Sequence, residues 1–291
     1  MCTANAPCLL EFAAVSHRYG QDQGGLDACT LRIAAGSRNA LIGCNGAGKT
    51  TLLLHAVGLL RPEQGEVRFA GQPLNYQARH LHTLRRRVGL VFQNPDHQLF
   101  AATVSEDISF GPLNLGLPVA EVRQRVAQAM QAVALTPLAE TPLHQLSFGQ
   151  KKRVCIAGVL AMQPDLLLLD EPMAGLDHAM QAEFAELLTQ LGRQGITILL
   201  STHDLDFAYA WADHIHLLDR GQCQASLASH ELPRHAAALC QMGQPLPSVL
   251  TLHQALVARG ILPPQPAPRS QRELLALLAA PAFPPQPASC L

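Results

Sequence analysis

The sequence lacks a long apolar run, an excess of basic residues and any close pairing of its cysteines, and each absence excludes a class of protein. No apolar run approaches the roughly 18 residues that a membrane-spanning helix needs. A formal net charge of −1 argues against a nucleic-acid-binding surface over the whole protein, although a local basic patch stays open. The eight cysteines have no metal-ligand spacing, and residues 1–7 do not resemble a signal peptide, which favours reduced cytosolic thiols.

What the chain does have is length and apolar content. Its 291 residues suffice for one large domain with an appendage, or for two domains. Hydrophobic residues make up 48% and charged residues 15%, so the chain can bury a substantial core. We therefore expect a globular protein whose membrane role, if it has one, comes through a partner.

Residues 43–50, Gly-Cys-Asn-Gly-Ala-Gly-Lys-Thr, have the composition of a phosphate-binding loop. The loop follows a predicted strand end at 38–42 and opens a predicted helix at 49–57, the setting that such a loop needs. The glycines let backbone N–H groups turn inward, where they bind an anion together with the positive end of the helix. We expect Lys49 to reach the β- and γ-phosphates and the Thr50 hydroxyl to bind Mg²⁺. The predicted nucleotide-binding residues here are Asn45, Gly46, Ala47, Gly48, Lys49, Thr50 and Thr51.

Tyr19 lies on the predicted turn between two strands that precede the loop, 9–15 and 26–33. These strands indicate an antiparallel sheet beside the nucleotide. A tyrosine at this turn could stack on a purine ring, since every base has a π face. An ordinary tyrosine at a strand end is an equally good interpretation of this residue alone.

An acidic pair follows the apolar stretch 166–169, which reads as a fully buried strand. Acidic residues at the carboxyl end of such a strand lie where α/β folds bind ligands. We expect Asp170 to hold Mg²⁺, directly or through water. We expect Glu171 to orient and polarise the attacking water.

Two more polar side chains follow apolar stretches in the same way. The stretch 196–200 leads to His203, which can hydrogen-bond the γ-phosphate or the water, although a lone histidine is usually structural. The stretch 88–92 ends at Gln93, which can sense the γ-phosphate and Mg²⁺. Gln93, Glu171 and His203 are the predicted catalytic residues. Thr50, Gln93 and Asp170 are the predicted Mg²⁺ ligands.

Residues 146–153, Leu-Ser-Phe-Gly-Gln-Lys-Lys-Arg, resemble the signature motif of ATP-binding cassette (ABC) ATPases. The resemblance covers about residues 9–225. The motifs of the chain also follow this family's order, which is Tyr19, the loop 43–50, Gln93, the signature, Asp170-Glu171, residues 174–177 and His203. The resemblance implies an α/β P-loop NTPase core with an antiparallel β subdomain, a helical insertion and a short helical C-terminal extension. It also implies ATP and Mg²⁺ as cofactors.

The family implies a dimer of ATPase subunits, which we expect to be a homodimer with no nucleic-acid partner. Two subunits face each other head to tail, and ATP lies between the phosphate loop of one and Ser147, Gly149 and Gln150 of the other. Two residues depart from the family pattern. Phe148 replaces the usual first glycine of the signature, and Met173 replaces a small polar residue, which leaves the hydrolysis rate open.

Three stretches look like the energy-coupling factor (ECF) branch of the family, whose ATPases power bacterial import of vitamins or of cobalt and nickel: residues 93–100, 106–112 and 151–153. The signature phenylalanine looks most like the cobalt and nickel members. The resemblance thus implies a motor subunit on the cytoplasmic face of the bacterial inner membrane, bound peripherally to transmembrane coupling and substrate-binding subunits. A vitamin importer is the alternative. A soluble ABC ATPase is less favoured, because the chain has one phosphate loop and no long heptad run.

The chain is expected to divide into an ATPase domain at 1–228, with its helical subdomain at about 101–160, a helical extension at 229–260 and a proline-rich tail at 261–291. We expect the tail to be mostly disordered, with a short helix at 274–278 behind a Ser-x-x-Glu capping box. The predicted grip on the membrane partner is 96–100, where Asp96 offers charge and Leu99 and Phe100 offer apolar surface. A capped turn is the alternative for this stretch.

Overall fold

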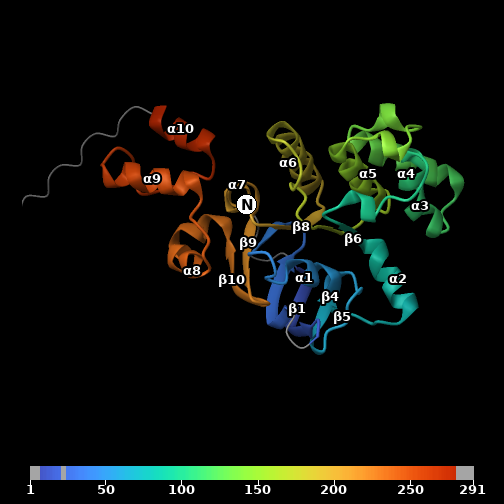
Figure 1. Cartoon of the computed structure of the whole chain (residues 1–291), viewed down its shortest axis with the longest axis horizontal. Helices are drawn as coiled ribbons and strands as arrows, with labels where there is room; N and C mark the ends of the chain where they lie inside the picture. Colours follow the sequence, from blue (N-terminus) through green and yellow to red (C-terminus); the bar gives the residue numbers. More distant parts are fainter. Residues whose placement is uncertain (1–6, 21–23, 280–291) are drawn as a thin grey trace, which may run out of the picture.

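The computed structural model describes residues 7–20 and 24–279 and contains two β-sheets (Figure 1). The smaller sheet is antiparallel, and its strand order is β2-β1-β4-β5. Its strands are β1 (Cys8–Arg18), β2 (Gly25–Ala34), β4 (Gln64–Phe69) and β5 (Gln72–Pro73). This is the antiparallel subdomain that the first two predicted strands indicated.

The larger sheet has the order β10-β9-β3-β8-β7-β6 and is parallel except at β10, which pairs antiparallel with β9. Its strands are β3 (Arg38–Ile42), β6 (Val88–Val91), β7 (Leu166–Leu169), β8 (Thr197–Thr202), β9 (His214–Asp219) and β10 (Gln222–Ala228). Because β3, β6, β7 and β8 run parallel, their carboxyl ends share one edge of the sheet. The motifs that follow these strands are thereby gathered there.

The four leucines of β7 show why its sequence is apolar throughout. Successive side chains of a strand point to opposite faces. Leu167 and Leu169 join the apolar core on one face of the sheet, and Leu166 and Leu168 join the core on the other face. The second core also contains Leu52 and Leu53 of helix α1 (Lys49–Ala56), packed against residues of both sheets.

The helices between β5 and β8 include a separate helical arm, drawn at the right of Figure 1. The arm consists of α3 (Val104–Asn114), α4 (Val119–Ala132) and α5 (Phe148–Leu160), with short 3-10 turns η2 (Thr136–Leu138) and η3 (Leu143–Gln145). A reciprocal capping box starts α3, where the Thr103 hydroxyl accepts from Glu106 N and the Glu106 carboxylate accepts from Thr103 N. Outside the arm lie α2 (Ala78–Arg87), η1 (Pro95–His97), α6 (His178–Arg193) and α7 (Leu205–Trp211).

After β10 the chain forms a helical extension of η4 (Ser229–His235), α8 (Ala236–Gln241), α9 (Ser248–Ala258) and α10 (Gln271–Ala279). The predicted α/β class, with an antiparallel sheet, a helical insertion and a helical extension, is confirmed. No helix within residues 7–20 and 24–279 has the length and apolar character to cross a bilayer.

The short helix expected at 274–278 is confirmed within α10, but the expectation that the tail is otherwise mostly disordered is wrong for residues 261–279. Leu262 and Leu274 are buried in the main core, and Glu273 N donates to Ser270 Oγ at the start of α10. Arg269 fixes the segment further, because its guanidinium donates to the Tyr209 and Ala212 carbonyls at the end of α7. Residues 280–291 lie outside the described part of the chain.

Candidate functional site

The loop between β3 and α1 has two glycines that no other residue could replace without a backbone shift. A Cβ on Gly43 would lie 2.4 Å from the Leu218 carbonyl oxygen, and a Cβ on Gly48 would lie 2.5 Å from the Gly25 carbonyl oxygen. Gly48 also has a φ of 102°, in the left-handed region that favours glycine. The predicted loop setting, a strand that ends at the loop and a helix that begins within it, is present.

The N-terminus of α1 has no side-chain cap. Gly48 is its N-cap, no side chain accepts from the first backbone N–H groups, and the first turn carries no acidic residue. Free N–H groups and the positive end of the helix dipole together attract an anion. Thr50 and Thr51, in the first turn, both line the cleft in front of the loop.

Lys49 lies across the loop. Its ammonium donates to the Gly43 carbonyl at 2.7 Å and to the Cys44 carbonyl at 3.3 Å, and it lies 3.3 Å from Glu171 Oε1. The side chain is buried. This cation is therefore held between the loop and the acidic residue that follows β7.

Asp170 and Glu171 follow β7 and take different positions. Asp170 accepts from the Thr50 hydroxyl at 2.7 Å and from the Ser201 hydroxyl at 2.6 Å, one bond on each carboxylate oxygen. Glu171 has a φ of 43°, unusual for a residue with a Cβ, and its backbone N–H donates to Ser201 Oγ. The Glu171 carboxylate lies between Lys49 and His203, whose Nδ1 is 3.1 Å from Glu171 Oε2.

A cleft of about 470 Å³ joins these groups. Tyr19 lines it with its ring edge-to-face on His17, 4.9 Å between centroids, and Gln93 lines it after the end of β6. The predicted residues that line this cleft are Tyr19, Asn45, Gly46, Gly48, Lys49, Thr50, Thr51, Gln93, Asp170, Glu171 and His203. Ala47 is buried beneath the loop and does not line the cleft.

The signature residues lie apart from this cleft. Ser147 is the N-cap of α5, where its hydroxyl accepts from Gln150 N and the Gln150 side chain accepts from Ser147 N at 2.9 Å. Ser147, Gly149 and Gln150 line a different cavity, which none of the phosphate-loop residues lines. One chain thus carries two separated sets of predicted nucleotide-binding residues.

The sequence reasoning missed two residues of this region. Ser201 fixes both Asp170 and the Glu171 backbone, and its place at the carboxyl end of β8, beside β7, was the available signal. Lys152 is buried and donates to the Pro172 and Ala174 carbonyls. Its signal was a lysine at helical spacing before the buried Ile156 and Val159.

His216, on β9, has a structural surrounding. His216 is buried, with Nδ1 2.8 Å from Ser226 Oγ and Nε2 3.2 Å from Asn39 Oδ1. Burial lowers the pKa of His216 to about 3, so the ring is neutral near pH 7. Within residues 7–20 and 24–279, no group of three or more His, Cys, Asp or Glu side chains could hold a metal ion.

A glycine-rich loop between a parallel strand and a helix, with an acidic pair at the end of another strand of the same sheet, defines a P-loop nucleotide-binding protein. The ABC transporter family model matches residues 26–174. The chain belongs to the ABC transporter family of ATPases.

Similar proteins indicate which branch of the family this chain resembles. The chain is 42% identical over 255 residues to the energy-coupling factor transporter ATP-binding protein EcfA of Methanocaldococcus jannaschii, covering 88% of this chain and 91% of the relative. It is 43% identical over 272 residues to the cobalt import ATP-binding protein CbiO of Rhodobacter capsulatus, covering 93% and 97%. Among solved structures, CbiO1 of Clostridium perfringens, part of the cbiONQ transporter complex, has a TM-score of 0.74 at 36% identity and covers 85% of this chain and 99% of its own.

A second solved structure bears on assembly. The ATP-binding cassette MJ0796, in a dimeric post-hydrolysis state bound to ADP and Pi, has a TM-score of 0.68 at 27% identity. The match covers 76% of this chain and 99% of that one.

Proposed function

We propose that this chain is the ATP-hydrolysing motor subunit of an energy-coupling factor importer that takes up cobalt or nickel ions. The relatives named EcfA and CbiO support the branch, and CbiO supports the cargo. The observation that carries the proposal is the divided site. The phosphate loop shares a cleft with Glu171, while the signature residues line a separate cavity of the same chain.

A divided site is completed by a second copy. In the proposed homodimer, the phosphate loop of one subunit faces Ser147, Gly149 and Gln150 of the other, and ATP lies between them. The capped N-terminus of α5 then adds its dipole to the γ-phosphate. The dimeric cassette bound to ADP and Pi supports this arrangement. Tyr19, at the rim of the cleft, stacks on the adenine.

Three side chains that line the nucleotide cleft offer oxygen ligands that suit Mg²⁺. Thr50 and Asp170 provide oxygen atoms 2.7 Å apart, and Gln93 lines the same cleft with an amide oxygen. These three residues would hold the ion, Asp170 directly or through water. When bound, the ion neutralises charge on the β- and γ-phosphate oxygens.

Hydrolysis follows from the remaining groups. The bound phosphates attract Lys49 away from Glu171, to which it is paired here at 3.3 Å. The freed Glu171 carboxylate orients and polarises the attacking water. His203, 3.1 Å from that carboxylate, hydrogen-bonds the γ-phosphate or the same water. Loss of the γ-phosphate removes the contacts that hold the dimer closed, and the opening drives the membrane partner.

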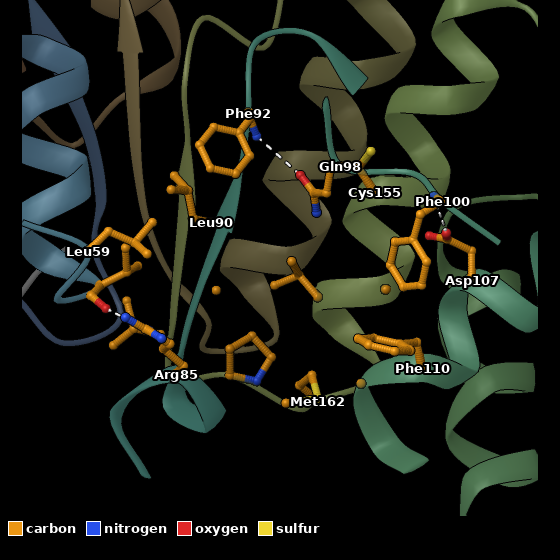
Figure 2. Close-up of a pocket in the computed structure, with 17 residues that line it drawn as sticks. Leu59, Arg85, Leu90, Phe92, Gln98, Phe100, Asp107, Phe110, Cys155 and Met162 are labelled. Atoms are coloured by element: carbon orange, nitrogen blue, oxygen red, sulfur yellow. Dashed lines mark hydrogen bonds between the residues drawn. The ribbon is translucent and has the colours of Figure 1, made fainter. Parts of the chain in front are cut away.

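The proposed docking surface for that partner is an apolar pocket of about 340 Å³ beside the helical arm (Figure 2). It is lined by Leu59, Leu90, Phe92, Phe100, Phe110 and Met162, among others. Phe100 and Phe110 meet edge-to-face at 4.5 Å between centroids, yet they are 62% and 48% exposed. A soluble protein rarely leaves such a pair uncovered without a partner.

Hydrogen bonds to Asp107 hold one end of the docking surface, and its other end adjoins the nucleotide cleft. The buried Asp107 carboxylate accepts from Phe100 N and Ala101 N at 3.0 and 3.1 Å, which holds the backbone that carries Phe100. Phe92 lines the pocket and the next residue, Gln93, lines the nucleotide cleft. A change at the γ-phosphate therefore reaches the partner through adjacent residues.

The occupant proposed for this surface is a short, partly basic helix of the transmembrane coupling subunit. The basic character of this helix is inferred from Asp96, whose carboxylate is mostly exposed. One of its oxygens lies 2.7 Å from Lys151 Nζ. Asp96 lines a neighbouring cavity that shares Phe100 with the docking surface. This assembly would place the chain peripherally on the cytoplasmic face of the bacterial inner membrane.

The experiment is purification of the tagged chain from membranes, identification of its partners, and measurement of ATP-dependent cobalt and nickel uptake by the complex. Copurified membrane subunits with uptake of either ion support the proposal. A complex that instead takes up a vitamin supports the second candidate, a vitamin importer. Recovery as a soluble ATPase without membrane partners would refute both.

A further inference from the structure

Lys152 of α5 is a buried cation without a carboxylate partner. Only 1% of the residue is exposed, and none of the ion pairs among residues 7–20 and 24–279 includes it. Its ammonium instead donates to the Pro172 and Ala174 carbonyls at 2.6 Å each, and reaches the Glu171 carbonyl at 3.5 Å. Burial lowers its pKa to about 8. A buried charge is costly unless its hydrogen bonds are made, so these carbonyls and the cation hold each other in place.

The turn that Lys152 grips begins with Glu171, in a backbone conformation that needs support. Its φ of 43° is in the left-handed region, which residues with a Cβ adopt only when the surrounding structure holds them there. Ser201 Oγ supports one side by accepting from Glu171 N, and Ala174 N donates to the Glu171 carbonyl at 3.1 Å. Lys152 supplies the remaining support from a different helix.

Phe148, the departure from the usual signature glycine, reaches the same turn. Its ring lies against Gly175, where an added Cβ would be 2.9 Å from Phe148 Cε1. The ring also lies 5.1 Å from the Lys152 ammonium, a cation–π contact. The first two turns of α5, the signature helix, thus contact both ends of the segment after Glu171, at Pro172 through Lys152 and at Gly175 through Phe148.

We propose that Lys152 and Phe148 are positioning residues that fix the turn from Glu171 to Gly175, and so make the placement of Glu171 depend on the signature helix of its own chain. This rests on the proposed function, in which one chain's signature and Glu171 serve different ATP molecules. Engagement of the signature on one ATP then sets the glutamate at the other ATP. The two sites of the dimer communicate within each subunit, through α5.

The first test is the Lys152→Met variant, which keeps length and removes the ammonium. We expect kcat for ATP hydrolysis to fall by about 10- to 100-fold, as expected for a slightly displaced catalytic group, with the KM for ATP changed less than about threefold. Lys152→Arg, which retains donors, should recover part of kcat. Arg125→Met is the matched control, because that guanidinium pairs with Glu121 within α4 and does not contact the turn.

Phe148→Ala serves if Lys152→Met does not fold, since it removes the ring from Gly175 and leaves the ammonium its carbonyls. It should lower kcat in the same direction, by a smaller factor. Normal kcat in both soluble variants, or equal loss in Arg125→Met, would overturn the inference. An inactive wild type would instead count against the proposed function itself.

Mixed dimers separate positioning of Glu171 from an effect on the signature. One chain carries Glu171→Gln, so all turnover depends on the Glu171 of the other chain. Lys152→Met placed in the chain with intact Glu171 should abolish most of the remaining turnover, and placed in the Glu171→Gln chain it should leave most of it. The reverse pattern would show that Lys152 acts through the signature on the opposite site, and would reject the proposal.

Discussion

The Thr50 hydroxyl donates a 2.7 Å hydrogen bond to Asp170, joining the first turn of α1 to the end of β7 across 120 positions of sequence. The second carboxylate oxygen of Asp170 is held by Ser201 at the end of β8. Three elements therefore meet at a single carboxylate, which is fixed before any cofactor binds. The carboxylate of Glu171, the next residue, is paired instead with Lys49 and His203.

We predict that Glu171→Gln binds ATP normally but hydrolyses it at least about 100-fold more slowly, at about 1.4 kcal/mol of barrier per factor of ten. The amide keeps the size of the carboxylate and loses the negative charge that polarises water. Steady-state ATPase assays, with ATP affinity measured alongside, check this. Near-normal turnover would sink the assignment of Glu171.

Lys49→Ala should have the opposite effect, because its main loss should be in nucleotide binding. Among the residues described at this cleft, the Lys49 ammonium is the buried cation that bridges the loop and the Glu171 carboxylate. Titration with a fluorescent ATP analogue measures the affinity. Unchanged affinity would contradict the phosphate role given to this residue.

We predict that alkylation of Cys44 blocks ATPase activity and that MgATP protects the thiol. Cys44 is exposed and lines the nucleotide cleft within the phosphate loop, where an added group would occupy the phosphate position. Mass spectrometry of the modified residue, with activity measured in parallel, is the check, and Cys44→Ser is the control for other thiols. Wild-type turnover by fully alkylated protein would mean that the loop does not bind phosphate in this way.

Asp96→Arg should leave ATP binding by the free subunit unchanged and weaken assembly with the membrane partner, together with transport. Removing one side of a desolvated charge pair typically costs about 2–5 kcal/mol. The pairing of Asp96 with Lys151 places a competing cation beside it, so Asp96→Asn should show a smaller loss in the same direction. Pull-down of the partner and nucleotide affinity are measured side by side. Full assembly with wild-type transport would place the grip elsewhere.

His216 predicts acid sensitivity of the fold. Its pKa is about 3 in the folded protein and about 6.5 in the unfolded chain, so between these values only the unfolded chain takes up the proton. Folding stability is therefore fully present above about pH 6.5 and falls as pH drops toward 3, by up to about 1.4 kcal/mol per pH unit from this group.

Urea unfolding of wild type and His216→Asn at pH 7.5, 6 and 5 measures this dependence. The variant should be less stable at pH 7.5. Its stability should fall less steeply on acidification, because its unfolding takes up about one proton fewer than that of the wild type. Equal slopes in wild type and His216→Asn would refute the assignment.

The isolated subunit should bind no cobalt or nickel ion tightly, because a motor has no need of the cargo. Both His216 nitrogens are already engaged by Ser226 and Asn39. Calorimetric titration of each metal, with a competing chelator, is the measurement. Stoichiometric binding that survives the competitor would mean that a metal site exists in this chain.

The sequence was most informative where a function requires residues that are consecutive. The phosphate loop, the acidic pair and the signature could all be placed on their elements because each motif has a fixed spacing relative to a strand or helix. Ser201 and Lys152 could not be given their contacts, because each acts on residues of another element brought close only by the sheet and helix packing. Nor could the sequence place Asp96 and Phe92 on neighbouring cavities.

The tail was misjudged for a similar reason. Its proline content is typical of disorder, but the decisive contacts are those of one side chain with the distant end of α7. Composition measures how much apolar surface a segment can bury, and it does not report whether another helix offers acceptors. Leu262 and Leu274 supply enough burial once Arg269 is anchored.

The Arg269 anchor also determines how far the chain can be shortened. α7 begins two residues after His203, and its final carbonyl groups, those of Tyr209 and Ala212, are the ones that Arg269 satisfies. A version trimmed to residue 260 would leave these acceptors without their donor and uncover the core beneath Leu262 and Leu274. Arg269, 66 residues after His203 in the sequence, thus supports the end of the helix that begins just after the histidine of the catalytic cleft.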